Sequence, residues 1–466
     1  AANYIVAEPT TLTGSIGIFG LIPDASQLLS DKLGLHFDVV KTNAHADFGT
    51  LARPFNPSEA QMMQGYIQRG YKLFTERVAD GRNMKTGQVE KLAEGRVWTG
   101  RQAVENGLAD ANGNLKIVGV GTSPSDGLRK GVVVNIEQTV QSIKKALEEA
   151  ELMAGCEIRS VYAGIAGSHI KSVNSHGMVA IRDREVTQAD IDRVIDTARA
   201  VSIPSDHQTL HVLPQEFCID GQEDVREPLG MSGVRLEARV HIVTGAVSAA
   251  QNITKCVRRC GLEANDLILQ PLASAEAVLT EDERDLGVCL IDIGGGTTDI
   301  AVLRGGAVRH TAVIPIAGDQ ITNDIAMALR TPTAEAEEIK IRYGVAKQVL
   351  ADPGESLEVP GLGDRGPRNL SRQALAAVIE PRVEEIFSLV HQVIRDSGYE
   401  ELLSSGIVLT GGGALLRNLD RVMARDTGMP VRIAPDAPLC VVLGTGRAAR
   451  NFNSFRRKNH PAKSHK

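Results

Sequence analysis

The order of apolar and polar residues divides the chain into segments of helical and strand character. Helical spacing marks 56–82, 86–95, 139–155 and 381–398, and strand-like runs are 159–170, 210–219 and 238–247. The segment 4–23 is broken into short strands by turn residues, and 351–369, rich in Gly and Pro, is expected to be a loop. Strands alternating with helices predict a mixed α/β fold.

The stretch "LIDIGGGTTDIAV" carries the first chemical signal. Val288 to Ile293 form a continuous apolar strand, Gly294 to Gly296 make a turn, and an alternating strand follows. A Walker loop needs Lys-Ser/Thr after its glycines and a dinucleotide fingerprint needs a helix there, and neither is present. Glycines let backbone N–H groups approach an anion. Asp292, at the strand end, is placed to hold Mg²⁺ through water.

A second glycine triplet follows another apolar strand. Ile407 to Leu409 lead into Gly411 to Gly413, and a helix is expected next. A tight turn between strand and helix explains one such triplet equally well. Two triplets, one in a hairpin and one before a helix, are more specific and indicate phosphate binding. We expect the two turns to face each other across a cleft.

Composition narrows the class of protein. A chain of 466 residues with 42% hydrophobic residues can bury two or three cores, so disorder is not expected. The net charge of −6 gives no reason to expect nucleic acid as a partner. Six scattered cysteines favour a reducing compartment, and Cys256 and Cys260 lack the histidines of a zinc site. No apolar run is long enough to span a membrane.

The middle of the chain, about 117–405, resembles the actin-like ATPase superfamily and, within it, the bacterial cell-division family FtsA. The resemblance runs through "GMSGVRLEARVHIVTGA" and "LASAEAVLTEDERDLGVCLIDIGGGTTDIAV". It implies an α/β, actin-like (ribonuclease H-like) two-lobed ATPase fold that binds ATP and Mg²⁺. It also implies a cytoplasmic scaffold at the inner face of the membrane at the division site. That scaffold would polymerise, link the FtsZ ring to the membrane and meet other divisome proteins.

The same resemblance assigns the site residues. It implies a second phosphate loop of Asp292, Gly294, Gly295, Gly296 and Thr297, an inter-domain connection at Gly318, ribose contacts from Glu337 and Lys340, and an adenosine loop of Gly411, Gly412 and Gly413, with Asp292 as the metal residue. A surface ion pair would equally explain Glu337 and Lys340 taken alone. Their position between two glycine loops favours the nucleotide.

Two features depart from the superfamily pattern. No first phosphate loop precedes "KIVGVGT", so the first lobe is incomplete and half of the phosphate clamp is missing. Gln270 stands where hydrolytic relatives carry a glutamate that orients water, and an amide cannot act as a general base. We therefore expect at most a weak ATPase. The amphipathic C-terminal helix of the FtsA family is also not seen, so membrane attachment would need a targeting helix from elsewhere.

The first 114 residues resemble a different family. "LAEGRVWTGRQAVENGLAD" is similar to the C-terminal half of the signal peptide peptidase SppA, a Ser-Lys protease with a ClpP/crotonase-like α/β fold. The nucleophile's SGG stretch is expected upstream of residue 1, and Ala46 precedes Asp47 where short-form relatives carry the lysine. Protease activity is therefore not expected. Ser15 is better explained by strand-turn structure.

The sequence thus predicts a mosaic, whose last part, about 406–450, resembles MreB. The expected parts are 1–114, an SppA-like fragment; 115–284, a first lobe with an extra subdomain at about 158–210; 285–450, a second lobe; and 451–466, a basic tail. The leading hypothesis is an ATP-binding cell-division scaffold. The alternatives are a fragment of an S49-type signal peptide peptidase and a non-functional mosaic.

Overall fold

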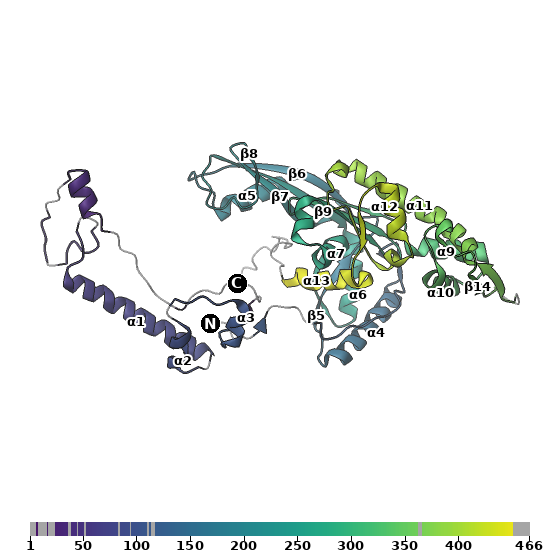
Figure 1. The fold of residues 1–466 in the computed structure, drawn as a ribbon, viewed down its shortest axis with the longest axis horizontal. Coiled ribbons are helices and arrows are strands. Elements are labelled where there is room, and N and C mark those ends of the chain that lie inside the picture. The colour runs from purple at the N-terminus through teal and green to yellow at the C-terminus, as the bar shows by residue number, and fades with distance from the viewer. Residues whose placement is uncertain are drawn as a thin grey trace. The chain divides into compact units, whose positions relative to one another are not determined.

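The computed structural model forms two compact units, residues 1–116 and 117–466, and each is described by itself (Figure 1). The residues described are 6–7, 16, 24–35, 39–43, 45–50, 53–82, 84–93, 95–109, 111–112, 117–361 and 366–450. Ser15, the predicted basic tail at 451–466 and most of the predicted strands at 4–23 lie outside them.

The first unit is mainly helical in its described part. Its elements are β1 (Val6–Ala7), η1 (Leu28–Lys32), α1 (Pro57–Arg82), α2 (Thr86–Leu92), α3 (Gly100–Glu105) and β2 (Ala111–Asn112), with β1 and β2 parallel. The two predicted helices are confirmed as α1 and α2. A small core of Ile16, Ala79, Val89 and Ala93 joins them.

The second unit is built on a five-stranded sheet in the order β13, β12, β11, β16, β17. Its strands are β11 (Val288–Ile293), β12 (Thr298–Arg304), β13 (Ala307–Ile314), β16 (Ile407–Thr410) and β17 (Val431–Ile433). Along β11 the alternate residues Cys289, Ile291 and Ile293 enter one core, while Val288 and Leu290 enter another. Helices cover both faces, so the strand is fully buried, as its continuous apolar run predicted.

The larger core packs one face of this sheet against helices. They are α9 (Gly318–Leu329), α10 (Thr333–Tyr343), α11 (Arg372–Asp396) and α12 (Leu419–Thr427). The helix expected at 381–398 begins at Arg372 instead, with Pro381 in its interior. The loop expected at 351–369 is wrong in part, because β14 (Ser356–Val359) and β15 (Arg368–Ser371) pair as antiparallel strands.

Apart from a hairpin of β3 (Leu128–Arg129) and β4 (Val132–Val133) and the inserted sheet described below, the first lobe has a two-stranded parallel sheet among the described residues. This sheet consists of β5 (Ser160–Ile165) and β10 (Glu263–Leu269), and the helices of the lobe are α4 (Ile136–Ala154), α6 (Val247–Arg259) and α7 (Gln270–Val278). Helix α13 (Cys440–Arg450), from the segment expected in the second lobe, packs against α7 and β5. Helix α4 ends at Ala154 and is capped by Gly155 in the left-handed conformation, so the predicted end of this helix is confirmed. The β3–β4 hairpin precedes α4.

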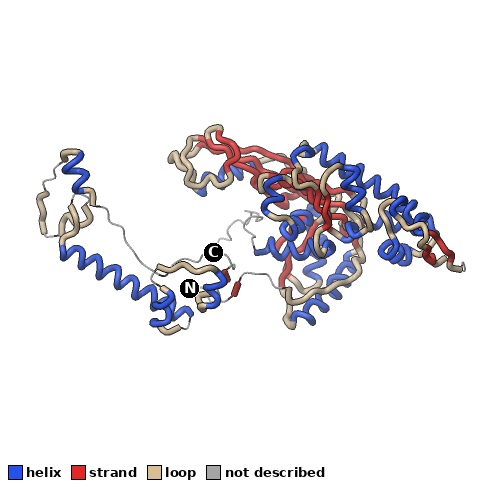
Figure 2. The backbone as a smooth tube through the Cα atoms, in the orientation of Figure 1, coloured by secondary structure: helices blue, strands red, loops and turns tan. Residues whose placement is uncertain are grey.

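A four-stranded antiparallel sheet with one helix is inserted after β5 (Figures 1 and 2). It consists of β6 (Lys171–Ala180), α5 (Gln188–Arg199), β7 (His207–Ile219), β8 (Gln222–Val225) and β9 (Arg235–Ala246), in the strand order β6, β9, β7, β8. Ser172, Asn174 and Gln215 donate hydrogen bonds of 3.0, 3.2 and 2.8 Å to main-chain oxygens of the edge strand β13. Side chains of the inserted sheet thus cover that edge.

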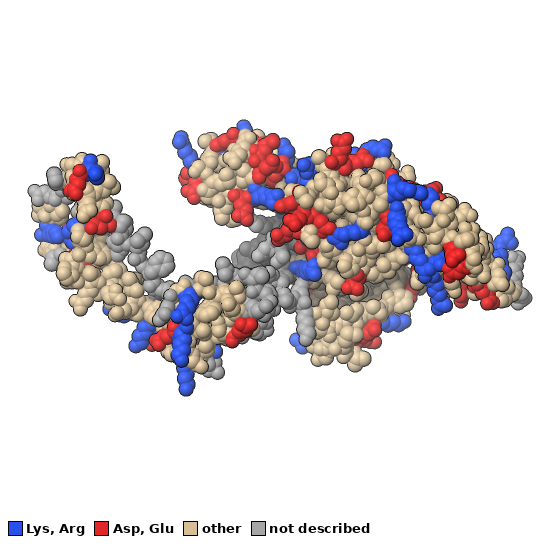
Figure 3. Space-filling model, viewed as in Figure 1, with Lys and Arg blue, Asp and Glu red and all other residues tan. Residues whose placement is uncertain are grey.

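The visible face of the second unit carries charges of both signs (Figure 3). On this face, acidic and basic side chains are interspersed. Among the described residues, no helix is both long and apolar enough to cross a bilayer.

Candidate functional site

The two glycine loops leave neighbouring strands at the same edge of the five-stranded sheet. Strands β11 and β16 are parallel, and Asp292 pairs in register with Thr410 immediately before the loops. A side chain on Gly411 would lie 2.3 Å from the Ile293 carbonyl oxygen, so this loop packs directly on the end of β11. The turns therefore lie side by side rather than across a cleft, because parallel neighbours end at the same edge.

A third segment joins the first glycine loop. Gly318, the first residue of α9, donates its backbone N–H to the Gly294 oxygen at 3.1 Å, and Asp319 donates to the Gly295 oxygen at 2.7 Å. A Cβ on Gly318 would lie 3.2 Å from the Gly294 oxygen. This close approach explains a glycine at the position.

The predicted ribose residues lie beside Gly318. The Lys340 ammonium donates to the Gly318 oxygen at 3.1 Å and pairs with the Glu337 carboxylate at 2.7 Å. Thr322 on α9 is hydrogen-bonded to both side chains. The structure therefore brings Gly294, Gly318, Glu337 and Lys340 into one connected group, as a shared ligand would require.

Asp292 is buried at the base of the first loop. Burial raises the pKa of its carboxyl group, while a hydrogen bond from the Ser274 hydroxyl, 2.6 Å from Oδ2, acts in the opposite direction. Ser274 belongs to α7, which follows the first-lobe strand β10. The hydrogen bond thus connects the first lobe to the glycine loop of the second. Nothing in the local sequence of either residue indicated this contact.

A second buried carboxylate, Asp299, was missed by the sequence reasoning. It pairs in register with Asp292 across the hairpin and accepts a hydrogen bond from Thr297 at 2.7 Å. Burial, together with the neighbouring Asp292 charge, raises its pKa to about 7. The hairpin pattern could have revealed this residue. If the turn spans 294–297, the paired positions are 293 with 298 and 292 with 299.

The residues at this sheet edge fit a phosphate-bound cation. Gly295 and Gly412 are exposed at the tips of their loops, and a Cβ on Gly412 would have no neighbour within 4 Å. Oδ1 of Asp299 is buried and accepts no hydrogen bond from any described residue. Two facing carboxylates, one with a free buried oxygen, are the kind of oxygen ligand that Mg²⁺ prefers.

Gln270 lies at the start of α7, directly after β10. It is one helical turn before Ser274, and residues four apart share a helix face. Its Cγ would approach a Cβ on Gly164 to 3.3 Å, so the side chain packs against β5. The amide is therefore on the side of α7 that carries the contact to Asp292.

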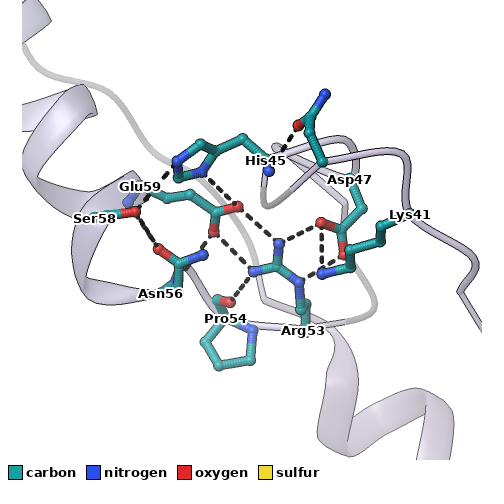
Figure 4. A network of polar contacts seen from close by, with 9 residues as sticks. Lys41, His45, Asp47, Arg53, Pro54, Asn56, Ser58 and Glu59 are labelled. Carbon is teal, nitrogen blue, oxygen red and sulfur yellow. Dashed lines mark hydrogen bonds and ion pairs between the residues drawn. The ribbon is translucent and has the colours of Figure 1, made fainter.

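The first unit has its own polar network (Figure 4). Arg53 bridges Asp47 at 2.6 Å and Glu59 at 2.7 Å, and Lys41 also pairs with Asp47. The Ser58 hydroxyl lies 3.4 Å from His45 Nε2, and His45 Nδ1 lies 3.7 Å from Glu59 Oε1. The arrangement has the residue types of a catalytic triad.

The hydrogen bonds of this network oppose such a role. The Ser58 hydroxyl donates to Asn56 at 3.0 Å rather than to the histidine. Arg53 occupies both oxygens of Glu59 and lowers the pKa of that carboxyl group to about 2. The Glu59 carboxylate is thus engaged by Arg53, and its Oε1 lies 3.7 Å from His45 Nδ1, which is longer than the hydrogen bond of a triad acid. The network is consistent with a structural ion-pair cluster.

Comparison with known proteins identifies the family of the second unit. Residues 289–444 match the family model "Cell division protein FtsA", and residues 167–244 match "SHS2 domain inserted in FTSA". The cell division protein FtsA of Pseudomonas aeruginosa is 65% identical over 327 residues, which are 70% of this chain and 78% of the relative. The chain belongs to the FtsA family.

Further relatives agree with this family. The FtsA protein of Escherichia coli K12 is 48% identical over 365 residues, which are 77% of this chain and 86% of the relative. The FtsA model extends to residue 444 and so includes the segment that resembles MreB. The resemblance to the FtsA family inferred from the sequence is confirmed.

The fold also matches a solved structure. The structure named "PilM-PilN type IV pilus biogenesis complex" has a TM-score of 0.50 and 17% identity, and covers 72% of this chain and 90% of the other. The actin-like α/β fold predicted from the sequence is thereby confirmed. Residues 1–119 match the model "Peptidase family S49", which confirms the second resemblance.

Proposed function

We propose that the FtsA-like unit binds ATP with Mg²⁺ at the adjoining glycine loops, and that nucleotide stabilises its assembly-competent state. One observation carries this proposal: Gly294, Gly318, Lys340 and Gly411, which are far apart in the sequence, lie together at one edge of the sheet. Such convergence at the carboxyl ends of parallel strands, where α/β folds bind their ligands, supports a shared site. A ligand that binds one conformation shifts the population toward it.

Each predicted residue has a role in this proposal. The backbone N–H groups of Gly294, Gly295, Gly296 and Thr297 would hold the phosphates, Glu337 and Lys340 the ribose, and Gly411, Gly412 and Gly413 the adenosine. Asp292 would hold Mg²⁺ through water, with Asp299 behind it. Bound Mg²⁺ would neutralise phosphate charge. A cation there would also offset the burial of two carboxylates that face each other across one hairpin.

We propose at most slow turnover for this site. Gln270 lies on the α7 face that carries the contact to Asp292, and an amide can orient water but cannot accept its proton. Nucleotide would therefore act mainly as a conformational ligand.

The cellular role follows from the family. We propose that the nucleotide-bound protein polymerises, links the FtsZ ring to the cytoplasmic face of the membrane and meets other divisome proteins. The membrane contact would need a targeting helix supplied elsewhere. Membership of a cell-division family supports this role. Sedimentation of the purified chain with and without ATP, and with FtsZ polymers, tests both associations.

Equilibrium dialysis with labelled ATP tests the nucleotide proposal directly. The full chain should bind ATP in the presence of Mg²⁺, and an excess of unlabelled ATP should displace the label. No binding at millimolar ATP would refute the proposal and leave the non-functional mosaic. A fluorophosphonate probe tests the peptidase alternative, and we expect no labelled serine.

Asp292→Asn tests the placement of the metal. The amide keeps the shape of the carboxylate and its contact with Ser274, but it loses the charge that holds a divalent cation. We expect the Mg²⁺-dependent gain in ATP affinity to disappear, while affinity in EDTA stays within about twofold of the wild-type value. An unchanged Mg²⁺ dependence would show that Asp292 is not the metal residue.

A further inference from the structure

A two-residue turn in the first lobe lies against the first glycine loop. Lys130 and Gly131 close the β3–β4 hairpin with φ values of +49° and +76°. Two central residues with positive φ define a type I′ turn, whose first position favours Asn, Asp or Gly. A lysine in left-handed backbone is less favourable there. The hairpin alone therefore does not explain this residue, and such an outlier points to a function.

The backbone of this turn is packed between two glycine-containing loops. A Cβ on Gly296 would lie 3.0 Å from both the backbone nitrogen and the Cα of Lys130. A Cβ on Gly131 would lie 3.0 Å from the backbone nitrogen of Gly167, in the loop after β5. Any side chain at Gly296 would push the turn away. The stem of Lys130 therefore starts at the glycine loop itself.

The ammonium group of Lys130 has no ion-pair or hydrogen-bond partner among the described residues. The residue is exposed. Lysine places a compact positive charge on a flexible four-carbon stem, which suits it to bind phosphate. The nearest loop is the one proposed to hold phosphate. In the superfamily pattern a first phosphate loop would hold the phosphates from the opposite lobe, but no such loop precedes residue 117.

We propose that Lys130 binds the phosphate chain of the nucleotide and replaces part of the missing first phosphate loop. The inference rests on the proposed function, and it adds a residue and a ligand group. Lys130 then makes the β3–β4 hairpin a first-lobe contact to a ligand held mainly by the second lobe. Nucleotides with more phosphate charge gain more from this contact.

The variant Lys130→Asn separates this role from a structural one. Asn-Gly is the preferred pair for a type I′ turn, so the hairpin should be retained or stabilised while the ammonium group is lost. Lys130→Arg keeps the charge and serves as the rescue variant. Lys145→Gln, an exposed lysine on α4, is the control for loss of one positive charge.

The measurement is the dissociation constant of the full chain for ATP, AMP and adenosine by isothermal titration calorimetry with Mg²⁺. We expect Lys130→Asn to weaken ATP binding at least tenfold, to change adenosine binding less than twofold and to leave the melting temperature unchanged or higher. Lys130→Arg and Lys145→Gln should stay near the wild-type values.

Two results would overturn the inference, and they are distinguishable. If the wild-type chain binds ATP and Lys130→Asn binds it equally well, Lys130 is not a phosphate contact and the proposed function stands. An equal loss of ATP and adenosine binding would likewise exclude a phosphate-specific role. If the wild-type chain binds neither ligand, the proposed function fails together with this inference.

Discussion

His241, on β9, is a buried histidine with both ring nitrogens engaged. Nδ1 lies 2.6 Å from Asn174 Oδ1 and Nε2 lies 2.9 Å from Thr311 Oγ1. Because the asparagine oxygen can only accept, Nδ1 carries the proton and Nε2 accepts from the threonine hydroxyl. This neutral ring joins the inserted sheet to β13. Burial, together with a smaller effect of the nearby His310, lowers its pKa to about 4.

We expect this histidine to make the second unit sensitive to acid. In the unfolded chain the ring takes up a proton near its ordinary pKa of 6.5, whereas the folded chain resists protonation until about pH 4. The unfolded state therefore binds more protons as the pH falls through this window, and the free energy of unfolding falls with it. The loss attributable to His241 is about 3 kcal/mol between pH 6.5 and pH 4.

Urea unfolding across this pH range measures the effect. His241→Gln should be less stable at pH 7 but should lack this part of the pH dependence. His176→Gln changes an exposed histidine on β6 and serves as the control. A His241→Gln variant with the same pH profile as the wild type would rule out this origin of the acid sensitivity.

At single residues, the sequence revealed the groups that belong to a motif. Asp292 and the glycines were identifiable because their chemistry requires a fixed local order. Ser274 and Lys130 were not, because each reaches the loop from another element and no local pattern records that contact. Asp299 is an intermediate case, since only the pairing of β11 with β12 shows that it lies opposite Asp292.

Among the elements, the turn after β16 depends on its first glycine and not on its second. Gly411 has φ +83° and ψ 166°, a region that only glycine adopts readily, and its Cβ would meet the Asp292 carboxylate at 2.5 Å. We expect Gly411→Ala to lower the free energy of unfolding by about 3 kcal/mol through backbone strain and overpacking. Thermal or urea unfolding measures this change.

Gly412→Ala is the matched control for this turn. Its Cβ would enter open space, and its backbone needs no left-handed conformation. The stability of this variant should stay within about 0.5 kcal/mol of the wild-type value. Equal destabilisation by both alanines would show that the turn is not held against Ile293 as described.

Helix α11 shows why its limits were predicted incorrectly. A proline normally ends the helix that precedes it and is well tolerated in the first turn of the next one. The helix was therefore expected to start at Pro381. The buried positions of α11 nevertheless continue across the proline, with Leu375 and Ile379 before it and Val383 after it. Packing of this face against the larger core outweighs one lost backbone hydrogen bond, and a single-residue rule does not include that packing.

On the scale of the whole molecule, the two units should behave as independent domains. Contacts within 1–116 and within 117–466 define two compact units, each with its own hydrophobic core. We expect deletion of residues 1–116 to leave the melting temperature of the second unit within about 2 °C and its ATP affinity within about twofold. A large fall in either quantity would show that the units depend on each other.

Part of the second unit, including β5, β7, β9, β11 and α4, followed from periodicity, and its family followed from motifs. The adjacency of the two glycine loops did not, because it depends on a crossover of more than a hundred residues that makes β16 the neighbour of β11. Sequence spacing cannot show which parallel strands become neighbours. The two loops therefore lie next to each other along one edge of the sheet, and not on opposite sides of a cleft as expected.

The edge of the sheet at β13 is covered by side chains, and this limits how copies of this chain can associate there. Carbonyl groups on an unprotected sheet margin recruit strands from other molecules and seed uncontrolled aggregation. Here Ser172, Asn174 and Gln215 occupy those acceptors within the same molecule. Any association of copies through the β13 edge must therefore use side-chain surfaces, which can dissociate, instead of backbone hydrogen bonds between strands, which seldom do.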